Sequence, residues 1–199
     1  DLWIHLGASL EAQGRTTDAM DLYQDLVVIS SDPVAHGRLA WMLSRHGGTP
    51  AQIERHLKFA DRSKLRGETI RAQYTRLRVQ LTLPKAPIDS VIDKLGIMWE
   101  RRDDVASHID TFELGMSYVT ALIKRRLPRD LRRTREVLPT LGQLTYDQYS
   151  LDTLRCLDGL ITHVPATKRP KKTADGEAAG NAAAPETPKS GTFADMVSS

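Results

Sequence analysis

The stretch that decides the fold is WIHLGASLEAQGRTTDAMDLYQDL, residues 3–26. It follows the pattern W-x2-L-G-x2-L-x3-G-x4-A-x3-Y-x2-L, and most of this pattern recurs about 34 residues later. Small and apolar residues that recur at this period are typical of a solenoid built from helix pairs. The matching positions are Leu6, Gly7, Leu10 and Gly14 with Leu39, Ala40, Leu43 and Gly47, then Ala19, Tyr23 and Leu26 with Ile53, Leu57 and Ala60.

The positions of the pattern have physical reasons. Trp3, Leu6 and Leu10 have the i, i+3, i+7 spacing of a helix face that packs on a core. Glycine in a helix interior costs about 1 kcal/mol relative to alanine, so Gly7 indicates that a second helix approaches closely. Gly14 is expected to end this first helix.

Start signals for further helices follow. Thr17-Asp18 provides cap residues for a second helix. The steps Asp32-Pro33 and Thr49-Pro50 each place a cap residue before a proline at the first helical position. The sequence therefore predicts consecutive helix–turn–helix units.

These motifs resemble the tetratricopeptide repeat family over residues 1–64. The first repeat carries the fuller match, because the second has Ala40 in place of glycine and Ile53 in place of a small residue. The resemblance implies an all-α fold in which antiparallel helix–turn–helix repeats stack as a short right-handed solenoid. It also implies that the inner helices of the repeats line a concave groove, which holds a protein partner.

The rest of the chain divides by its composition. Residues 65–102 read as a degenerate third helical pair, and residues 103–165 as helices that cap the solenoid. Within the cap we expect one long helix over 105–123, a shorter helix ending near Pro139, and a final helix that buries Cys156. Residues 166–199 hold few apolar side chains and are expected to be a disordered tail.

Composition limits the class of protein. With 199 residues and 40% hydrophobic content, the chain is long enough for one sizeable core. No apolar run approaches the roughly 20 residues that cross a bilayer. A single cysteine excludes an intramolecular disulfide and favours a reducing compartment such as the cytoplasm. Since the chain begins at Asp1, inside a motif, we expect it to be part of a longer protein.

Groove positions follow from the resemblance. One subgroup of the family holds a peptide carboxylate with Lys and Asn, at the places where this chain has Ile4 and Ala8, which argues against that mode of binding. Trp41 is either a groove-facing hot spot or a core residue. The candidate partner-binding residues are Ile4, Ala8, Glu11, Trp41 and Arg45.

Clustered arginines are the second signal, although the net charge is only +3. Such a basic ridge either attracts acidic peptides or phosphates, or forms a solvated face with local ion pairs. Aromatic residues do not alternate with these arginines, which weakens the case for stacking on bases. The candidate ridge residues are Arg71, Arg78, Arg125, Arg129, Arg132 and Arg133.

We found no catalytic or metal-binding motif in the sequence, and no cofactor is expected. The favoured hypothesis is a non-catalytic scaffold or adaptor for a protein or peptide partner, with the basic ridge selecting an acidic one. The alternatives are an RNA-binding pentatricopeptide-like protein, and an accessory domain of a larger enzyme or of a membrane-anchored envelope protein. Self-association through an exposed end of the solenoid stays open.

Overall fold

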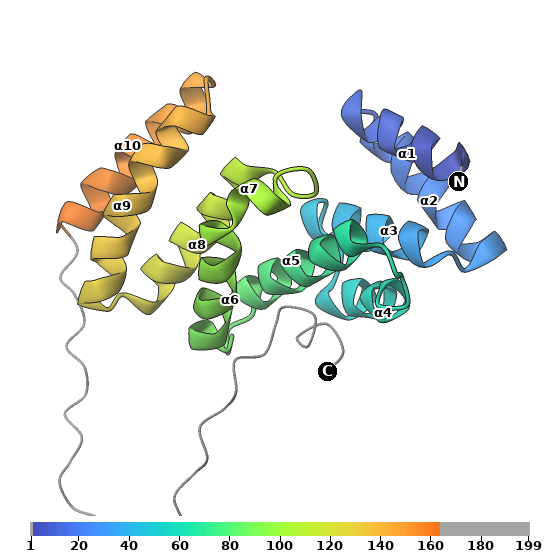
Figure 1. Ribbon diagram of the computed structural model, residues 1–199, viewed down its shortest axis with the longest axis horizontal. Coiled ribbons are helices and arrows are strands. Elements are labelled where there is room, and N and C mark those ends of the chain that lie inside the picture. The colour runs from blue at the N-terminus through green and yellow to red at the C-terminus, as the bar shows by residue number, and fades with distance from the viewer. Residues whose placement is uncertain (1, 164–199) are drawn as a thin grey trace, which may run out of the picture. The chain divides into compact units, whose positions relative to one another are not determined.

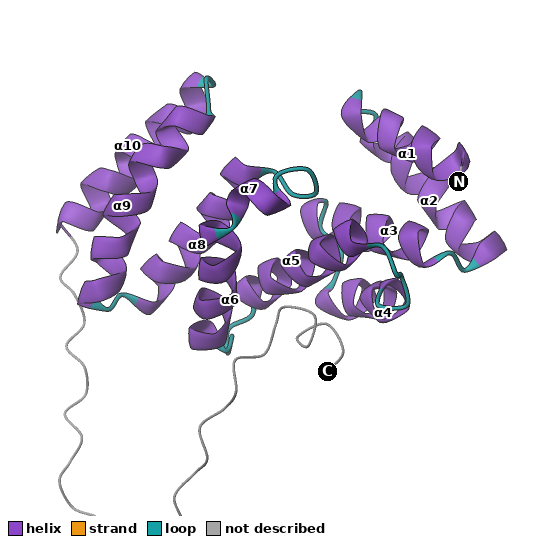
Figure 2. Ribbon diagram, viewed as in Figure 1, coloured by secondary structure: helices purple, strands orange, loops and turns teal. Residues whose placement is uncertain are grey.

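The computed structural model describes residues 2–163, and in this range it is built from helices and connecting loops without a strand (Figure 2). The all-α class is therefore confirmed. The helices, labelled in Figure 1, are α1 Leu2–Ala12, α2 Thr16–Ser30, α3 Pro33–Arg45, α4 Pro50–Ala60, α5 Arg66–Thr82, α6 Ile88–Glu100, α7 Arg102–Val105, α8 Thr111–Arg125, α9 Pro128–Leu144 and α10 Gln148–His163. Within this range, no helix is both long and apolar enough to span a bilayer.

Neighbours in sequence pack on each other along most of the chain. In addition, α3 packs on α5. Because α7 is a single turn, α6 packs on the next long helix, α8. One core cluster extends from Leu10 to Ile161. A second cluster joins α3, α4 and α5 through Ala40, Ile53, Leu57, Ala60 and Ala72.

The predicted helix boundaries are partly confirmed. Asp32 accepts hydrogen bonds from the backbone N–H groups of Val34 and Ala35, and Thr49 forms a capping box with Gln52. Gly14 adopts a φ of 72°, which ends α1 as expected. The Thr17-Asp18 cap is wrong: α2 begins at Thr16, and the residue before it makes no side-chain cap hydrogen bond.

Gly7 is needed because an aromatic ring lies on it. A Cβ atom at this position would come within 2.5 Å of Cε1 of Tyr23, which is fully buried. The core stripe predicted for this helix is wrong in part, since Trp3 and Leu6 are 57% and 45% exposed and only Leu10 is buried.

Helices α6 and α8 also pack a ring on a glycine, and each of the two helices contributes one ring and one glycine. Tyr118 of α8 packs against Gly96 of α6, where an added Cβ would lie 3.2 Å from the hydroxyl. Trp99 of α6 packs against Gly115 of α8, where a Cβ would come within 2.6 Å of Cζ3. Small residues at these places let two bulky rings fill the interface between the helices.

The predicted long helix over 105–123 is wrong. Val105 ends α7, and Asp110 starts α8 by accepting a hydrogen bond of 2.7 Å from the backbone N–H of Glu113. Val105 and Ile109 are both buried although they belong to different segments. The spacing of apolar residues therefore continues through the loop between α7 and α8, so it did not reveal that the helix ends there.

Two further expectations for the C-terminal helices are wrong. Pro139 does not end a helix but lies inside α9, on its exposed side. Cys156 is exposed, because α10 buries Leu154 and Ile161 and a residue two positions after Leu154 lies on the opposite side. The predicted disordered tail, 166–199, lies outside the described residues.

The substitution Gly7→Ala tests the packing of Tyr23. We expect it to lower the free energy of unfolding by about 1–3 kcal/mol, because the methyl group overlaps a ring that has no room to move. Gly159→Ala on α10 is the matched control, since nothing lies within 4 Å of its added Cβ, and it should be neutral or stabilise by up to about 1 kcal/mol. Urea unfolding followed by circular dichroism measures both; equal effects would contradict the packing argument.

Candidate functional site

Helices α3 and α5 carry the same pattern 33 residues apart. Each has an arginine, an aromatic residue three positions later, and a second arginine four positions after that. Such residues share one face of a helix, and the rings of the two aromatic residues lie 5.7 Å apart. We call this set the arginine ladder, in which two arginine rungs flank an aromatic pair: Arg38, Trp41 and Arg45 on α3, and Arg71, Tyr74 and Arg78 on α5.

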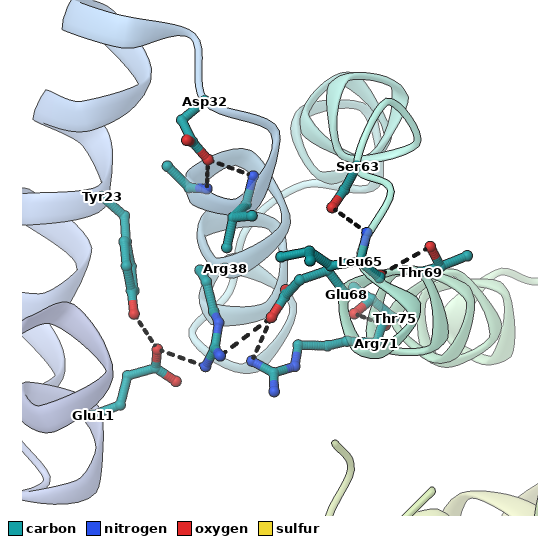
Figure 3. A network of polar contacts seen from close by, with 12 residues as sticks. Glu11, Tyr23, Asp32, Arg38, Ser63, Leu65, Glu68, Thr69, Arg71 and Thr75 are labelled. Atoms are coloured by element: carbon teal, nitrogen blue, oxygen red, sulfur yellow. Dashed lines mark hydrogen bonds and ion pairs between the residues drawn. The ribbon is translucent and has the colours of Figure 1, made fainter. Parts of the chain in front are cut away.

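The first rung, Arg38 and Arg71, shares the carboxylate of Glu68. Arg38 Nη2 donates to Glu68 Oε1 over 3.2 Å, and Arg71 Nη1 lies 4.0 Å from the same oxygen. Arg38 Nη1 also lies 3.6 Å from Oε1 of Glu11 on α1, which accepts a 2.6 Å hydrogen bond from the Tyr23 hydroxyl. Figure 3 shows Arg38 between the two carboxylates. The rung therefore ties α1, α2, α3 and α5 together.

Burial dominates the electrostatics of the first rung. The side chains of Arg38, Glu68 and Arg71 are only 11–18% exposed. Burial lowers the pKa of Arg71, as does the like charge of Arg38, while Glu68 and Glu11 oppose the shift. Burial and the hydrogen bond to Glu11 raise the pKa of Tyr23. The Tyr23 hydroxyl thus keeps its proton and serves as a donor.

The second rung, Arg45 and Arg78, shares Glu113 of α8. Arg45 Nη2 lies 3.5 Å from Glu113 Oε2, and Arg78 Nη1 pairs with Glu113 Oε1. Both guanidinium groups lie over Trp41, 5.2 and 5.3 Å from a ring centroid, which is within cation–π range. This rung is more open, because 48% of the Arg45 side chain and 23% of the Arg78 side chain are exposed.

The predicted groove residues lie in different environments. Trp41 is 8% exposed and belongs to the core cluster, so of the two interpretations the structure favours the core residue. Arg45 is exposed beside it, and Ile4, Ala8 and Glu11 on α1 are partly buried. Glu11 and Arg45 enter the polar contacts of the ladder, whereas Ile4 packs against the core.

The predicted basic ridge is divided among three helices. Arg71 and Arg78 belong to the ladder. Arg125, at the end of α8, pairs with Asp89 and Asp130 at 2.5 and 2.6 Å. Burial acts to raise the pKa of Asp130, but the hydrogen bonds from Arg125 and from the Leu127 backbone outweigh it, so that pKa is lowered.

The remaining ridge residues are on α9. Arg133 pairs with Glu100 and Glu136. Arg129 and Arg132 are exposed, and Arg129 Nε lies 3.9 Å from Asp130 Oδ1. Several of these arginines therefore connect helices of this chain.

Four residues of this site were not predicted from the sequence. They are Arg38 and Tyr74 of the ladder, and Glu68 and Glu113, which pair with its arginines. The signal for Arg38 and Tyr74 is the recurrence of R-x2-[WY]-x3-R at 33 residues, which was readable. Tyr74 pairs with the Ser117 hydroxyl over 2.9 Å, and burial raises its pKa to about 12. Glu68 and Glu113 have no comparable signal, because tertiary packing brings them to the arginines. Glu68 meets Arg38 where α5 packs on α3, and Glu113 reaches Arg45 and Arg78 from α8.

A pair of histidines joins α3 and α4. Nδ1 of His36 lies 2.9 Å from Nδ1 of His56, and the His36 ring stacks on Phe59 with centroids 4.4 Å apart. Burial and the charge of His56 lower the pKa of His36, and burial and Arg55 lower that of His56. One neutral imidazole thus donates to the other. Between residues 2 and 163, no group of three or more His, Cys, Asp and Glu side chains is arranged to hold a metal ion.

Comparisons of the chain with protein-family models, with curated proteins and with solved structures found no match.

Arg38→Met tests the first rung. Removing the central guanidinium leaves Glu11 and Glu68 without their shared partner, so we expect a loss of about 3 kcal/mol in the free energy of unfolding. Arg15→Met is the control, because the Arg15–Asp18 pair is about half exposed and its loss should cost under about 1 kcal/mol. Equilibrium urea unfolding compares the two. Similar small losses would show that the rung contributes little.

The histidine pair predicts a pH dependence of stability. Since both pKa values are lowered on folding, the unfolded chain takes up protons first as the pH falls below about 6.5. The free energy of unfolding should therefore be greatest above that pH and decrease as the pH falls through the lowered values. His56→Gln should make this decrease in the free energy of unfolding smaller. His46→Gln, at an exposed position, should leave the decrease unchanged. The free energy of unfolding would be measured in urea at pH 7.5 and pH 5.5. An identical change between the two pH values in the wild type, His56→Gln and His46→Gln would exclude the histidine pair as the cause.

Proposed function

We propose that this chain is a non-catalytic helical-repeat scaffold or adaptor that binds a protein or peptide partner. In this proposal α1 with α2, and α3 with α4, are tetratricopeptide-like repeats, and α5 with α6 is a degenerate third pair. Two observations support it. Gly7 and Ala40 are equivalent and both buried, as are Tyr23 and Leu57. Moreover, α3 packs on α5, as the first helices of successive repeats do.

The observation that carries the proposal is the exposed second rung of the ladder. Arg45 and Arg78 lie over the buried indole ring of Trp41, on a face shared by α3 and α5, and arginine is among the residues that contribute most to binding energy in many protein interfaces. A pair of guanidinium groups selects carboxylates by geometry as well as by charge. An acidic segment is therefore the partner chemistry that this face favours.

The ladder also supports a binding role over a catalytic one. Its carboxylates, Glu11, Glu68 and Glu113, lie against arginines or accept from a tyrosine. These carboxylates are engaged by side chains of this chain, and Glu11, Glu68 and Glu113 are each only 11–18% exposed, so they are poorly placed to meet a substrate. Arginine itself stays protonated.

Arg45→Gln tests the proposal without disturbing the core. With the full chain as bait in a nuclease-treated native lysate, we expect a discrete protein partner whose affinity falls about tenfold in this variant, roughly the value of one charge-assisted contact. Affinity would be measured on the purified partner by titration calorimetry. Trp41→Ala is less suitable, because removing a buried indole creates a cavity that costs about 3–5 kcal/mol.

Arg155→Gln is the matched control, since Arg155 is 71% exposed and pairs with Asp152 of the same helix, α10. It should leave binding unchanged. A partner that binds both variants equally would place the interface elsewhere. Binding that disappears on nuclease treatment, and that weakens steeply with salt, would instead support the RNA-binding alternative.

A further inference from the structure

Glu113 is held between arginines of two other helices. It lies on the first turn of α8, between Arg45 of α3 and Arg78 of α5. Three helices thus converge on one carboxylate, and the face of Trp41 lies under both guanidinium groups. The two guanidinium groups that face this carboxylate come from α3 and α5, and α8 supplies the carboxylate.

The pair of guanidinium groups suits a carboxylate for geometric reasons. Guanidinium is planar and presents paired N–H groups that match the two oxygens of a carboxylate. The Trp41 ring restricts the orientation of both arginines by cation–π contact. Because Trp41 is buried and fixed, the two charges are held near each other before any ligand arrives, which lowers the entropy cost of binding.

Glu113 satisfies this pair of arginines imperfectly. Its Oε2 is buried but accepts no hydrogen bond from the described part of the chain, and Arg45 Nη2 remains 3.5 Å away. Nearly half of the Arg45 side chain is exposed to solvent, whereas only 18% of the Glu113 side chain is. A carboxylate arriving from solvent would therefore meet Arg45 first, on its open side.

The start of α8 does not depend on the Glu113 carboxylate. Asp110 caps that helix by accepting the backbone N–H of Glu113 over 2.7 Å, so the side chain can rotate away while the helix end stays satisfied. The Asp110 carboxylate stays nearby and keeps part of the local negative charge. Displacement thus requires a change of side-chain rotamer and not a movement of α8.

We propose that Glu113 is an internal competitor that occupies, in the free protein, the site of an acidic side chain of the partner. This proposal rests on the proposed function and specifies its chemistry and its regulation. A ligand has to bring a carboxylate in order to replace Glu113, so neutral segments are rejected. The competition also weakens the binding of any isolated acidic group, and only a segment with further contacts binds tightly.

Glu113→Gln, in the full chain, tests the competition directly. The probe is a fluorescein-labelled tetraglutamate peptide with an amidated C-terminus, and binding is followed by fluorescence anisotropy at 50 and 150 mM salt. We expect Glu113→Gln to bind the probe about tenfold more tightly than the wild type. The double variant Arg45→Gln/Glu113→Gln should lose this gain. Thermal unfolding by circular dichroism checks that each variant is folded.

Glu136→Gln is the control for net charge, because Glu136 is an exposed partner of Arg133 on α9. Its affinity for the probe should stay within about twofold of the wild type. An equal gain in Glu113→Gln and Glu136→Gln would overturn the proposal, since it would be an effect of overall charge. Weaker binding by Glu113→Gln would also overturn it, because Glu113 would then organise the arginines for the ligand.

Two further outcomes separate this proposal from others. A labelled hexauridine RNA that gains more affinity than tetraglutamate in Glu113→Gln would overturn the assignment of a carboxylate ligand. An Arg45-dependent protein partner, with equal tetraglutamate affinities for the wild type and Glu113→Gln, would overturn the competition and leave the proposed function intact. Tighter tetraglutamate binding by Glu113→Gln, without any captured protein partner, would support the competition and contradict the proposed function.

Discussion

Two arginines that face each other across a helix interface need a carboxylate between them, and this requirement organises the contacts around α3 and α5. The ladder repeats at 33 residues, so the contact of α3 with α5 brings arginines together twice. Burying like charges side by side is costly unless an opposite charge is shared between them. Glu68 meets this need at the first rung and Glu113 at the second. Because Glu113 comes from α8, and Glu11 adds a contact from α1, the same requirement connects four helices.

Close packing of rings on glycine complements these polar contacts. Tyr23 on Gly7 joins α1 to α2, and Trp99 on Gly115 joins α6 to α8. The Tyr23 ring also presents its hydroxyl to Glu11, so one side chain serves the apolar contact and the polar network together. A residue larger than glycine at Gly7 would therefore disturb the first rung as well as the core. Packing and charge pairing are coupled in this part of the molecule.

Local signals in the sequence predicted the helical class and several boundaries, because capping and the freedom of glycine are decided by a few neighbouring residues. Asp32 and Thr49 act as predicted. Features that depend on the rotation of a helix against its neighbours were not predictable in this way. Cys156 and Pro139 are exposed because of how α9 and α10 face each other, which apolar spacing alone does not fix.

In the candidate site, too, the residues that belong to a local sequence pattern were predictable, and those that depend on tertiary contacts were not. Arg45 and Trp41 were identified from their repeat positions, and the matching Arg78 came from charge clustering. The carboxylates that hold these arginines lie far away in sequence, and the contact between α5 and α8 that brings Glu113 to them has no counterpart in the repeat. Charge clustering alone therefore could not distinguish an exposed basic ridge from arginines that are paired within the chain.

Exposure along the ladder separates a structural role from a binding role. At the first rung, Arg38 and Arg71 are 18% and 13% exposed and are enclosed by Glu11 and Glu68, so a ligand would have to break buried ion pairs to reach them. At the second rung, Arg45 is 48% exposed and its contact with Glu113 is long. The aromatic pair between the rungs is buried, which leaves no ring face for a nucleic-acid base to stack on. One repeated pattern thus has enclosed arginines at one end and a more open pair at the other, and that open pair is the basis of the proposed binding of an acidic segment.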